Sequence, residues 1–310
     1  MVGVDVPLCA REESGGRVVD VTVVIGTRDR REQALATVRR LRSLPERPPV
    51  IVVDDGSIDG TADAVRHAFP DVVVVDHAGP RGVTAARNAG VRRAHTPYVA
   101  FADDDSWWAP GALPVISRAF AAHPRLAVVA ARIVVGDDER LDPTCAVMSA
   151  SPLSSDGLPG PRVLGFVACG TAVRREAFLA VCGFPHSYVI GGEEEPLALA
   201  LAAAGWDLAY VDEAVAHHHP DTVPRDRSSR DRRMLRNDLW TAWRHRRGLG
   251  VLARTGELFR DADSPAKRRG ILDAARGLPH VLATRRPVPA HIEAQLRQLT
   301  RPAQRHPHRR

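Results

Sequence analysis

The sequence predicts an α/β fold in which a mainly parallel central sheet is flanked by helices. Short apolar segments rich in valine and isoleucine alternate with amphipathic helical segments along the first half of the chain. Polar residues follow the apolar segments, and prolines follow several of the helical ones. Strands that alternate with helices form parallel sheets with right-handed crossovers. The 310 residues are enough for one large α/β domain with an extension.

Four apolar segments of the first half are predicted to be buried parallel strands. They are short and rich in β-branched residues, and they cover residues 18–25, 50–53, 72–75 and 98–102. Three segments between them have apolar residues at helical spacing, and they cover residues 30–44, 61–69 and 83–94. Pro45 and Pro70 end the first two of these helices, because proline interrupts helical hydrogen bonding.

The second half is predicted to continue the sheet and to end in helices. Further helices are expected at residues 110–122 and 193–204, and further strands at residues 126–135, 166–173 and 206–211. Residues 136–161 are rich in Asp, Ser, Pro and Gly and are expected to form a long loop. From about residue 225 onward the pattern is helical and basic, whereas residues 1–17 are expected to form a flexible leader.

Charge divides the chain into two unequal parts. The net charge is +6, but residues 225–310 hold 22 Lys and Arg against 8 Asp and Glu, which makes them about +14. Residues 1–224 are about −8. One interpretation is a solvated arginine-rich helical extension, and the other is a surface for anionic lipid headgroups or a phosphorylated acceptor. No recognised nucleic-acid motif is present, so no nucleic-acid partner is expected.

Neither a membrane span nor a disulfide framework is expected. The sequence has no run of 18 or more apolar residues, and residues 1–17 lack the basic-then-apolar order of a signal peptide. The four cysteines show no CxxC spacing, which favours free thiols in a cytoplasmic protein.

Polar side chains gather where the predicted strands end. The first strand is followed by Gly26-Thr27-Arg28-Asp29, the second by Asp54-Asp55-Gly56-Ser57, and the fourth by Asp103-Asp104-Asp105. In open parallel sheets, ligands bind beyond the carboxyl ends of the strands. Three adjacent carboxylates repel one another, so they indicate a hard cation that neutralises them. The alternative is a solvated acidic turn.

Four segments in this order resemble the family 2 glycosyltransferases with the GT-A fold, namely VVDVTVVIGTRDR, VIVVDDGSIDGT, RGVTAARNAG and YVAFADDDSWWAP. The resemblance implies a Rossmann-like catalytic domain at residues 18–224, divided into a nucleotide-binding half at 18–105 and an acceptor half at 106–224. A basic helical C-terminal extension follows at 225–310. The resemblance also implies transfer of a sugar from a nucleoside-diphosphate sugar, of UDP or TDP type, to an acceptor hydroxyl with inversion.

The resemblance implies donor-binding roles for residues of the nucleotide-binding half. Thr27 and Arg28 correspond to the loop that touches the nucleobase, and Asp54 and Asp55 to residues that bind base and ribose. The other residues that the resemblance assigns to the nucleotide-sugar site are Arg81, Arg87, Asp103 and Asp104. For Arg87, contact with the donor diphosphate and contact with a carboxylate of the site are both open.

Asp103 and Asp105 match the two ends of the family's D-x-D motif. The resemblance implies that Asp105 binds a divalent cation, Mg²⁺ or Mn²⁺, and that Asp103 contacts the ribose or the cation. Family members often complete the metal site with a histidine that follows a later strand. His218 aligns best with that histidine, and the adjacent His217 and His219 are the alternatives.

The catalytic base is expected in the stretch Gly191-Gly192-Glu193-Glu194-Glu195-Pro196-Leu197, which resembles the family's G-x-E-D-x-D-L. Glu194 takes the place of the family's catalytic Asp. Because Glu replaces Asp and Pro196 replaces an acidic residue, the assignment stays open among Glu193, Glu194 and Glu195. The alternative is an acidic helix start that the helix dipole favours by itself.

Two other functions are open at this point. A sugar-1-phosphate nucleotidyltransferase also uses a nucleotide and Mg²⁺, and Gly26-Thr27-Arg28 is similar to part of its glycine-rich loop, but the preceding glycines are missing. Its chemistry also favours a lysine, and no lysine precedes Lys267. The second alternative is a non-catalytic nucleotide-sugar-binding protein on the same scaffold.

The resemblance leaves the acceptor open between a lipid-linked glycan, a polysaccharide and a small molecule. The arginines from Arg227 to Arg236, with Trp240 and Trp243, resemble the basic helical region that some family members place after the catalytic domain. We therefore expect a cytoplasmic protein, and this region suits either peripheral contact with the inner face of the membrane and a lipid-linked glycan or, equally, a soluble natural-product acceptor.

Overall fold

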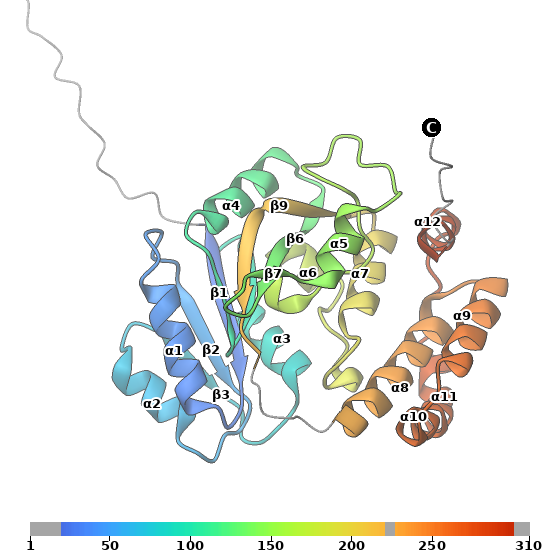
Figure 1. Ribbon diagram of the computed structural model, residues 1–310, viewed down its shortest axis with the longest axis horizontal. Helices are drawn as coiled ribbons and strands as arrows, with labels where there is room; N and C mark the ends of the chain where they lie inside the picture. Colours follow the sequence, from blue (N-terminus) through green and yellow to red (C-terminus); the bar gives the residue numbers. More distant parts are fainter. Residues whose placement is uncertain (1–19, 221–226, 301–310) are drawn as a thin grey trace, which may run out of the picture.

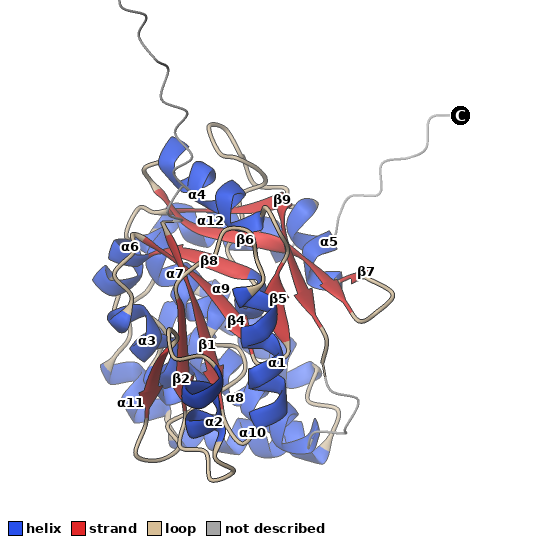
Figure 2. Ribbon diagram, turned by 90° about the vertical axis from the view of Figure 1, so that its left-hand side faces the viewer, coloured by secondary structure: helices blue, strands red, loops and turns tan. Residues whose placement is uncertain are grey.

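The computed structural model describes residues 20–220 and 227–300. In these two ranges nine strands form one sheet, in the order β3-β2-β1-β4-β8-β6-β9-β5, and β7 pairs with β6 outside this order. Helices cover both faces of the sheet (Figures 1 and 2). The predicted α/β class is confirmed. The predicted leader at 1–17 lies outside the described residues.

Four neighbouring strands of the first half run parallel, as predicted. They are β1 (Val21–Thr27), β2 (Val50–Asp54), β3 (Val73–Asp76) and β4 (Tyr98–Asp103). Thr27 lies opposite Asp54, and Gly26 lies opposite Asp103. The carboxyl ends of β1, β2 and β4 therefore meet at one edge, which brings their polar residues together.

The strands of the second half mix directions. They are β5 (Ser106–Trp108), β6 (Leu126–Val135), β7 (Arg140–Leu141), β8 (Thr171–Arg174) and β9 (Asp207–His218). Strand β8 runs antiparallel to β4 and β6, and β9 runs parallel to β6 and antiparallel to β5.

Two strand predictions need correction. The strand predicted at 166–173 begins only at Thr171, because Ala168–Gly170 form the short 3-10 helix η1. Gly170 lies so close to β6 that a Cβ there would come within 2.4 Å of Ile133 Cγ1, a packing constraint that the local pattern does not reveal. The strand predicted at 206–211 continues to His218, so two of the three histidines lie in the strand itself.

Helices on the two faces contribute to separate cores. One face carries α1 (Arg31–Arg42), α2 (Thr61–Ala68) and α4 (Ala112–Ala122). The other carries α3 (Val83–Arg93), α5 (Pro143–Ser149), α6 (Arg175–Ala180) and α7 (Glu194–Ala203). Successive side chains of β1 point to opposite faces of the sheet, so Val23 and Ile25 pack in the first core and Val24 packs in the second. Helix α5 replaces part of the loop predicted at 136–161, and Asp142 caps it by accepting from the Thr144 N–H at 2.7 Å.

The basic extension is helical, as predicted, but it is not a detached tail. It forms α8 (Arg227–His245), α9 (Leu249–Arg260), α10 (Pro265–Arg276), α11 (Leu278–Ala283) and α12 (Ala290–Thr300). Leu239 and Leu258 pack in a small core between α8, α9 and α10. Ile292 and Leu296 of α12 join the core of the α/β part beside α7 (Figure 1). None of the helices in the described residues has the length and apolar character needed to cross a bilayer.

Candidate active site

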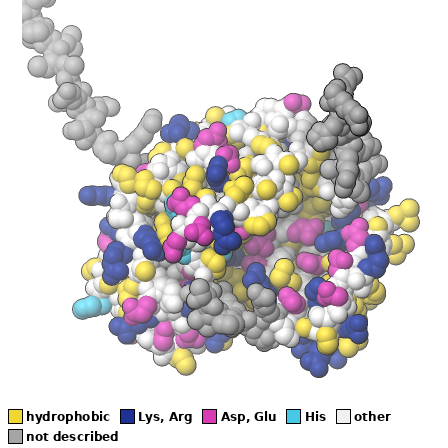
Figure 3. Space-filling view, in the orientation of Figure 1, with side chains coloured by type: hydrophobic (Ala, Val, Ile, Leu, Met, Phe, Trp, Pro, Cys, Tyr) yellow, Lys and Arg dark blue, Asp and Glu magenta, His cyan; other side chains and the backbone are white. Residues whose placement is uncertain are grey.

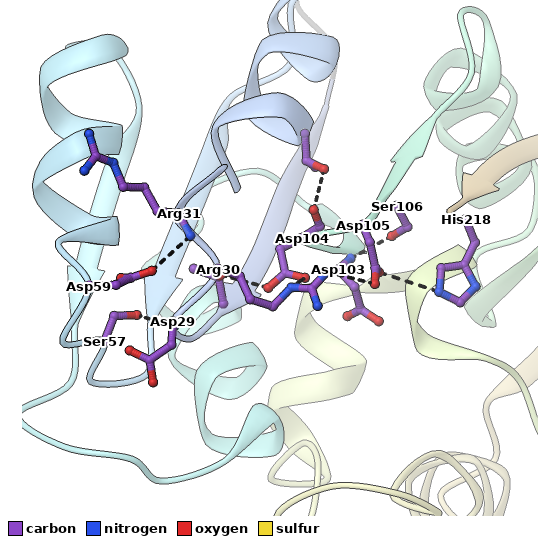
Figure 4. Close-up of polar contacts among 12 residues, drawn as sticks. Asp29, Arg30, Arg31, Ser57, Asp59, Asp103, Asp104, Asp105, Ser106 and His218 are labelled. Carbon is purple, nitrogen blue, oxygen red and sulfur yellow. Dashed lines mark hydrogen bonds and ion pairs between the residues drawn. The ribbon is translucent and has the colours of Figure 1, made fainter. Parts of the chain in front are cut away.

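The loops that follow β1 and β2 hold each other in place. The Asp29 N–H donates to Ser57 Oγ at 2.8 Å, and the Ile58 N–H donates to Asp29 Oδ1 at 2.8 Å. The Arg31 N–H donates to Asp59 Oδ2 at 3.2 Å (Figure 4). The polar residues of the DDGSIDGT segment therefore build a fixed edge above the sheet.

Asp54 and Asp55 at the end of β2 have different tasks. Asp55 accepts from the Arg81 N–H at 2.9 Å and from the Gly82 N–H at 2.7 Å, and its Oδ1 lies 2.8 Å from His77 Nδ1. Both of its oxygens thus hold the loop that precedes α3. Asp54 accepts from the Ser57 N–H at 2.6 Å, while its Oδ2 is buried without a hydrogen-bond partner among the described residues. A buried acceptor without a donor is costly, which is the condition expected of a ligand-binding oxygen.

Two arginines neutralise the acidic triplet that ends β4. Arg87 Nη2 donates to Asp103 Oδ1 at 2.7 Å. Arg30 reaches the other two carboxylates, with Nε 2.7 Å from Asp104 Oδ1 and Nη2 3.2 Å from Asp105 Oδ2 (Figure 4). A metal cation is the only neutralising charge expected from the sequence, and the role of Arg30 was not predicted. Its position just after β1, at the edge where β4 also ends, was the available signal.

Asp104 is buried, and hydrogen bonds attach it to β1 and α1. It accepts from Thr27 Oγ1 at 2.8 Å through its side chain and from Thr37 Oγ1 at 2.8 Å through its carbonyl. Burial raises the pKa of Asp104 to about 7, although Arg30 and the hydrogen bond from Thr27 oppose the shift. Thr27 and Asp104 are therefore hydrogen-bonded to each other. Their contact with a nucleotide-sugar donor stays a prediction.

A second acidic triplet begins α7, and Arg87 joins it to the first. Arg87 Nη1 donates to Glu193 Oε1 at 2.9 Å, and both side chains are almost fully buried. Burial lowers the pKa of Arg87, but the carboxylates of Asp103, Glu193 and Glu194 outweigh it and keep the guanidinium charged. One side chain from α3 thus connects two acidic clusters that are far apart in the sequence.

The three glutamates of this triplet have different surroundings. Glu193 pairs with Arg87, and its second oxygen is buried without a hydrogen-bond partner among the residues described. Burial and the adjacent Glu193 raise the pKa of the half-buried Glu194. Burial also raises the pKa of Glu195, but the opposing charges there are Arg254 and Arg246 of the extension. Glu193 and Glu194 therefore share the surroundings of Arg87, whereas Glu195 is influenced by the arginines of the C-terminal helices.

Two of the three histidines contact Asp105: the His219 N–H donates to the Asp105 carbonyl at 2.8 Å, and the His218 side chain lies beside the Asp105 carboxylate. His218 Nε2 is 3.6 Å from Asp105 Oδ1 (Figure 4). His217 stacks on Trp107 with ring centroids 5.4 Å apart, and His219 Nδ1 lies 3.2 Å from Asp137 Oδ1. Successive side chains of a strand point to opposite faces, which separates His218 from His217.

The tryptophans that follow the triplet are packing residues. Trp108 is fully buried and donates from Nε1 to the Phe101 carbonyl at 3.1 Å. The Arg40 guanidinium lies 3.7 Å from the centroid of the Trp107 ring. These contacts fix strand β5 beneath the triplet.

The described residues include no group of three or more His, Cys, Asp or Glu side chains arranged to hold a metal ion. Asp105 and His218 nevertheless place two suitable ligand types side by side, and Asp103 adds a carboxylate two residues away. Mg²⁺ is typically bound by one or two carboxylates, while substrate phosphates and waters complete its shell. The residues present therefore fit a cation that arrives with a nucleotide.

Two predicted donor-binding arginines lie at the surface. Arg28 is half exposed and pairs with Asp29 at 3.4 Å, and the Arg81 side chain is exposed while its backbone N–H holds Asp55. Both flank the buried edge formed by Asp54 and the triplet of β4. Their side chains do not belong to the buried network of Arg30, Arg87 and the carboxylates, and their contact with the nucleotide sugar stays a prediction.

Comparisons with known proteins identify a family and several relatives of this chain. Residues 22–181 match the family described as Glycosyl transferase family 2. A pre-mycofactocin glycosyltransferase of Mycobacterium tuberculosis is 32% identical over 222 residues, which cover 70% of this chain and 46% of that protein. The chain thus spans about half the length of this relative. An N-acetylglucosaminyl-diphospho-decaprenol L-rhamnosyltransferase of the same organism is 27% identical over 221 residues, 59% of this chain and 71% of that protein.

The fold has counterparts among solved structures. A mannosyltransferase from Pyrobaculum calidifontis, solved with GDP-Man and Mn²⁺, superposes with a TM-score of 0.57 at 20% identity. The match covers 90% of this chain and 85% of that one. The predicted GT-A fold is therefore confirmed.

Proposed function

The chain belongs to glycosyl transferase family 2, and from that premise we propose that it transfers a sugar from a nucleoside-diphosphate sugar to an acceptor hydroxyl with inversion. The observation that carries the proposal is the position of Arg87, which contacts Asp103 at 2.7 Å and Glu193 at 2.9 Å. It joins the segment proposed to hold the diphosphate to the segment proposed to activate the acceptor.

The donor is proposed to lie along the edge formed by β1, β2 and β4. The free buried oxygen of Asp54 suits a hydrogen-bond donor such as the imide N–H of uracil or thymine, which supports a UDP- or TDP-type donor. Arg28 and Arg81, at the rim of this edge, are proposed to contact the base and the diphosphate. Asp55 positions the loop of Arg81 by its two backbone contacts.

A divalent cation, Mg²⁺ or Mn²⁺, is proposed to bind at Asp105 and His218, with Asp103 as a further ligand or a ribose contact. When bound, such an ion stabilises the charge that develops on the departing diphosphate. Arg30 holds the Asp104 and Asp105 carboxylates in place at 2.7 and 3.2 Å. The solved mannosyltransferase that shares this fold holds Mn²⁺ together with GDP-Man, which supports the proposal.

Glu194 is proposed to be the catalytic base. It would take the proton of the acceptor hydroxyl as the oxygen forms its bond to the anomeric carbon and the bond to the nucleoside diphosphate breaks. Burial and Glu193 raise the pKa of Glu194, and a base with a raised pKa accepts a proton more readily near neutral pH. Glu193 is then the neighbour that Arg87 fixes, and it keeps Glu194 basic.

The acceptor and the location are proposed from the extension. Helix α9 exposes Leu249, Leu252 and Phe259 on one face, with the exposed Arg247 and Arg260 at its two ends. Figure 3 shows hydrophobic and basic side chains together at the right-hand side of the molecule, where Figure 1 places α9. An apolar stripe flanked by arginines suits the surface of an anionic bilayer. On this basis a cytoplasmic position at the inner face of the membrane and a lipid-linked acceptor are proposed, and one relative is named for a decaprenol-linked substrate. A polysaccharide or a small-molecule acceptor is the alternative.

One experiment tests the reaction and its rivals. The protein is incubated with UDP-, TDP- and GDP-sugars and Mn²⁺, and release of the nucleoside diphosphate is measured with and without acceptors. Release that needs an acceptor and Mn²⁺ supports the proposal. Release of pyrophosphate from a nucleoside triphosphate and a sugar phosphate would identify a nucleotidyltransferase. A Mn²⁺-dependent thermal shift with UDP, TDP or GDP but no turnover would identify a binding protein.

A further inference from the structure

We propose that Asn237, in helix α8 of the basic extension, is a positioning residue for the segment that carries Glu193 and Glu194. The inference rests on the proposed function and deepens it, because it assigns part of the acceptor-activating site to the C-terminal helices. Asn237 lies outside residues 22–181, which match the family. Three observations carry the inference: a side-chain clamp, a second anchor, and a strained residue between two rigid surfaces.

The clamp is formed by the Asn237 side chain, which is fully buried. Its Nδ2 lies 2.5 Å from the Gly191 carbonyl, 3.1 Å from the Tyr188 carbonyl and 3.4 Å from the Ile190 carbonyl. Its Oδ1 accepts from Arg236 at 2.8 Å, which fixes the orientation of the amide. The two N–H donors of one amide are thus shared among three backbone carbonyls of the segment that precedes Glu193.

The second anchor comes from the next turn of α8. Thr241 Oγ1 donates to the Asn237 carbonyl at 3.0 Å, and the Tyr188 hydroxyl lies 2.8 Å from Thr241 Oγ1. Tyr188 ends the short 3-10 helix η2 (His186–Tyr188) and is almost fully buried. The segment is therefore held to α8 through both a side chain and its backbone.

The backbone of Val189 is strained, and the contacts with α8 keep it in that conformation. Its φ of 60° and ψ of −60° lie outside the regions that a β-branched residue favours. Such conformations persist only where the surroundings impose them. On the side away from α8, a Cβ at Gly82 would come within 2.6 Å of Val189 Cγ1, and the Thr84 N–H donates to the Val189 carbonyl at 3.4 Å.

The segment from Tyr188 to Glu193 is thus closely packed between α8 and the start of α3. Helix α3 carries Arg87, which pairs with Glu193 three residues after Ile190. Two glycines with positive φ follow, and a Cβ at Gly192 would lie 3.1 Å from Asp238 Oδ1 of α8. Loss of the clamp leaves the Val189 strain unopposed, so we expect the segment to relax and Glu194 to lose its position. A displacement of about 1 Å in a reacting group can cost about a hundredfold in rate.

The test is Asn237→Ala, compared with Leu239→Ala as the matched control. Leu239 is fully buried in the same helix but packs toward α9 and α10, away from the segment. With the nucleotide sugar that the wild-type protein uses best, we expect Asn237→Ala to lower kcat at least tenfold. Its donor KM and its Kd for UDP, TDP or GDP with Mn²⁺ should stay within threefold. Leu239→Ala should lower the melting temperature while kcat below that temperature stays near the wild-type value.

The inference is overturned if folded Asn237→Ala keeps kcat within twofold of the wild type, or if Leu239→Ala loses kcat equally. If Asn237→Ala does not fold, Tyr188→Phe decides, since it removes only the hydroxyl contact with Thr241. We then expect a threefold to tenfold loss of kcat, and an unchanged kcat overturns the inference.

Failure of the proposed function can be told apart. If the wild-type protein turns over no nucleotide sugar, the proposed function fails, and hydrogen exchange still tests the clamp. The backbone amides of residues 188–193 should then exchange faster in Tyr188→Phe, and in Asn237→Ala where it folds, than in the wild type. Equal exchange rates would overturn the inference independently of any activity.

Discussion

The two acidic triplets of this protein, residues 103–105 and residues 193–195, have the same charge but opposite designs. The first ends a buried strand, and Arg87, Arg30 and Thr27 gather its carboxylates at one edge of the sheet. The second begins α7, where successive side chains point about 100° apart around the helix axis. Its members therefore have different neighbours. Glu193 pairs with Arg87, Glu194 is influenced by Glu193 and Arg87, and Glu195 is influenced by arginines of the extension. The local element decides which neighbours each carboxylate of a triplet reaches.

Breaking the link between the triplets should have the largest effect. Arg87→Met leaves Asp103 and Glu193 without their common cation, and Arg87 is only 4% exposed. Removing one partner of a buried ion pair typically costs about 3–5 kcal/mol of unfolding free energy. We expect a loss of this size in urea unfolding at pH 7. The half-exposed Arg28, changed to Met as a control, should shift stability by about 0.5 kcal/mol or less. A loss below about 1 kcal/mol at Arg87 would mean that the triplets are independent.

The second triplet can be divided by chemistry. Glu194→Gln removes the proposed base without changing the shape of the side chain, and kcat should fall by about 10²–10⁴. Glu195→Gln, one residue further along α7, should keep kcat within about threefold, because Glu195 faces the extension. Steady-state kinetics of both variants with the preferred donor provide the measurement. Equal losses would contradict the division of roles.

The first triplet should respond in binding more than in the proton-transfer step. Asp105→Asn weakens one proposed cation ligand, and we expect Mn²⁺-dependent nucleotide affinity to fall by at least about 10–100-fold, the range typical of changes to the outer-shell partners of metal ligands. Isothermal titration of UDP, TDP or GDP with and without Mn²⁺ measures it. Asp63→Asn is the control, since Asp63 is 90% exposed and lies in α2. An unchanged affinity in the Asp105 variant would remove Asp105 from the cation site.

The smallest effect concerns pH and the contact of Glu195 with the extension. Burial raises the pKa of Asp238 in α8 to about 6; Glu195 also raises it, and Arg254 opposes the shift. A carboxyl whose pKa is raised in the folded state favours folding most at low pH, and this contribution disappears as pH rises from about 4 through 6. Asp238→Asn should therefore gain, relative to the wild type, on the order of 1 kcal/mol between pH 4 and 7. Thermal unfolding at several pH values measures this, and the exposed Glu32→Gln should show no such relative change.

The first half of the fold and its polar edge were predictable because they depend on local patterns. Buried parallel strands are continuously apolar, and their carboxyl ends meet wherever they are neighbours. The positions of Asp54, Asp103 and Asp105 follow from this rule. Arg30 was missed because spacing along the chain does not say which way a side chain turns. Whether Thr27, Arg28 or Arg81 touches a donor stays a prediction.

The second half was less predictable because its elements depend on distant partners. Strand β5 has three residues and exists through its pairing with β9, where Ser106 lies opposite His218. Helices α5 and α6 have seven and six residues, too few for a helical period to stand out. The contacts of Asn237 with residues 188–191 link segments that show no common pattern.

Gly90 influences the position of the Arg87 guanidinium, which lies about one helical turn before it in α3. A Cβ at this position in α3 would come within 2.2 Å of Val24 Cγ1, so the helix rests directly on β1. The reach of an arginine side chain is limited. The distance of α3 from the sheet therefore determines which groups the Arg87 guanidinium can contact. If a methyl group lifted the helix, Arg87 could no longer span both acidic clusters. The missing Cβ at Gly90 thus sets the distance between α3 and β1, and this distance determines which carboxylates Arg87 can contact, although Gly90 itself contacts neither cluster.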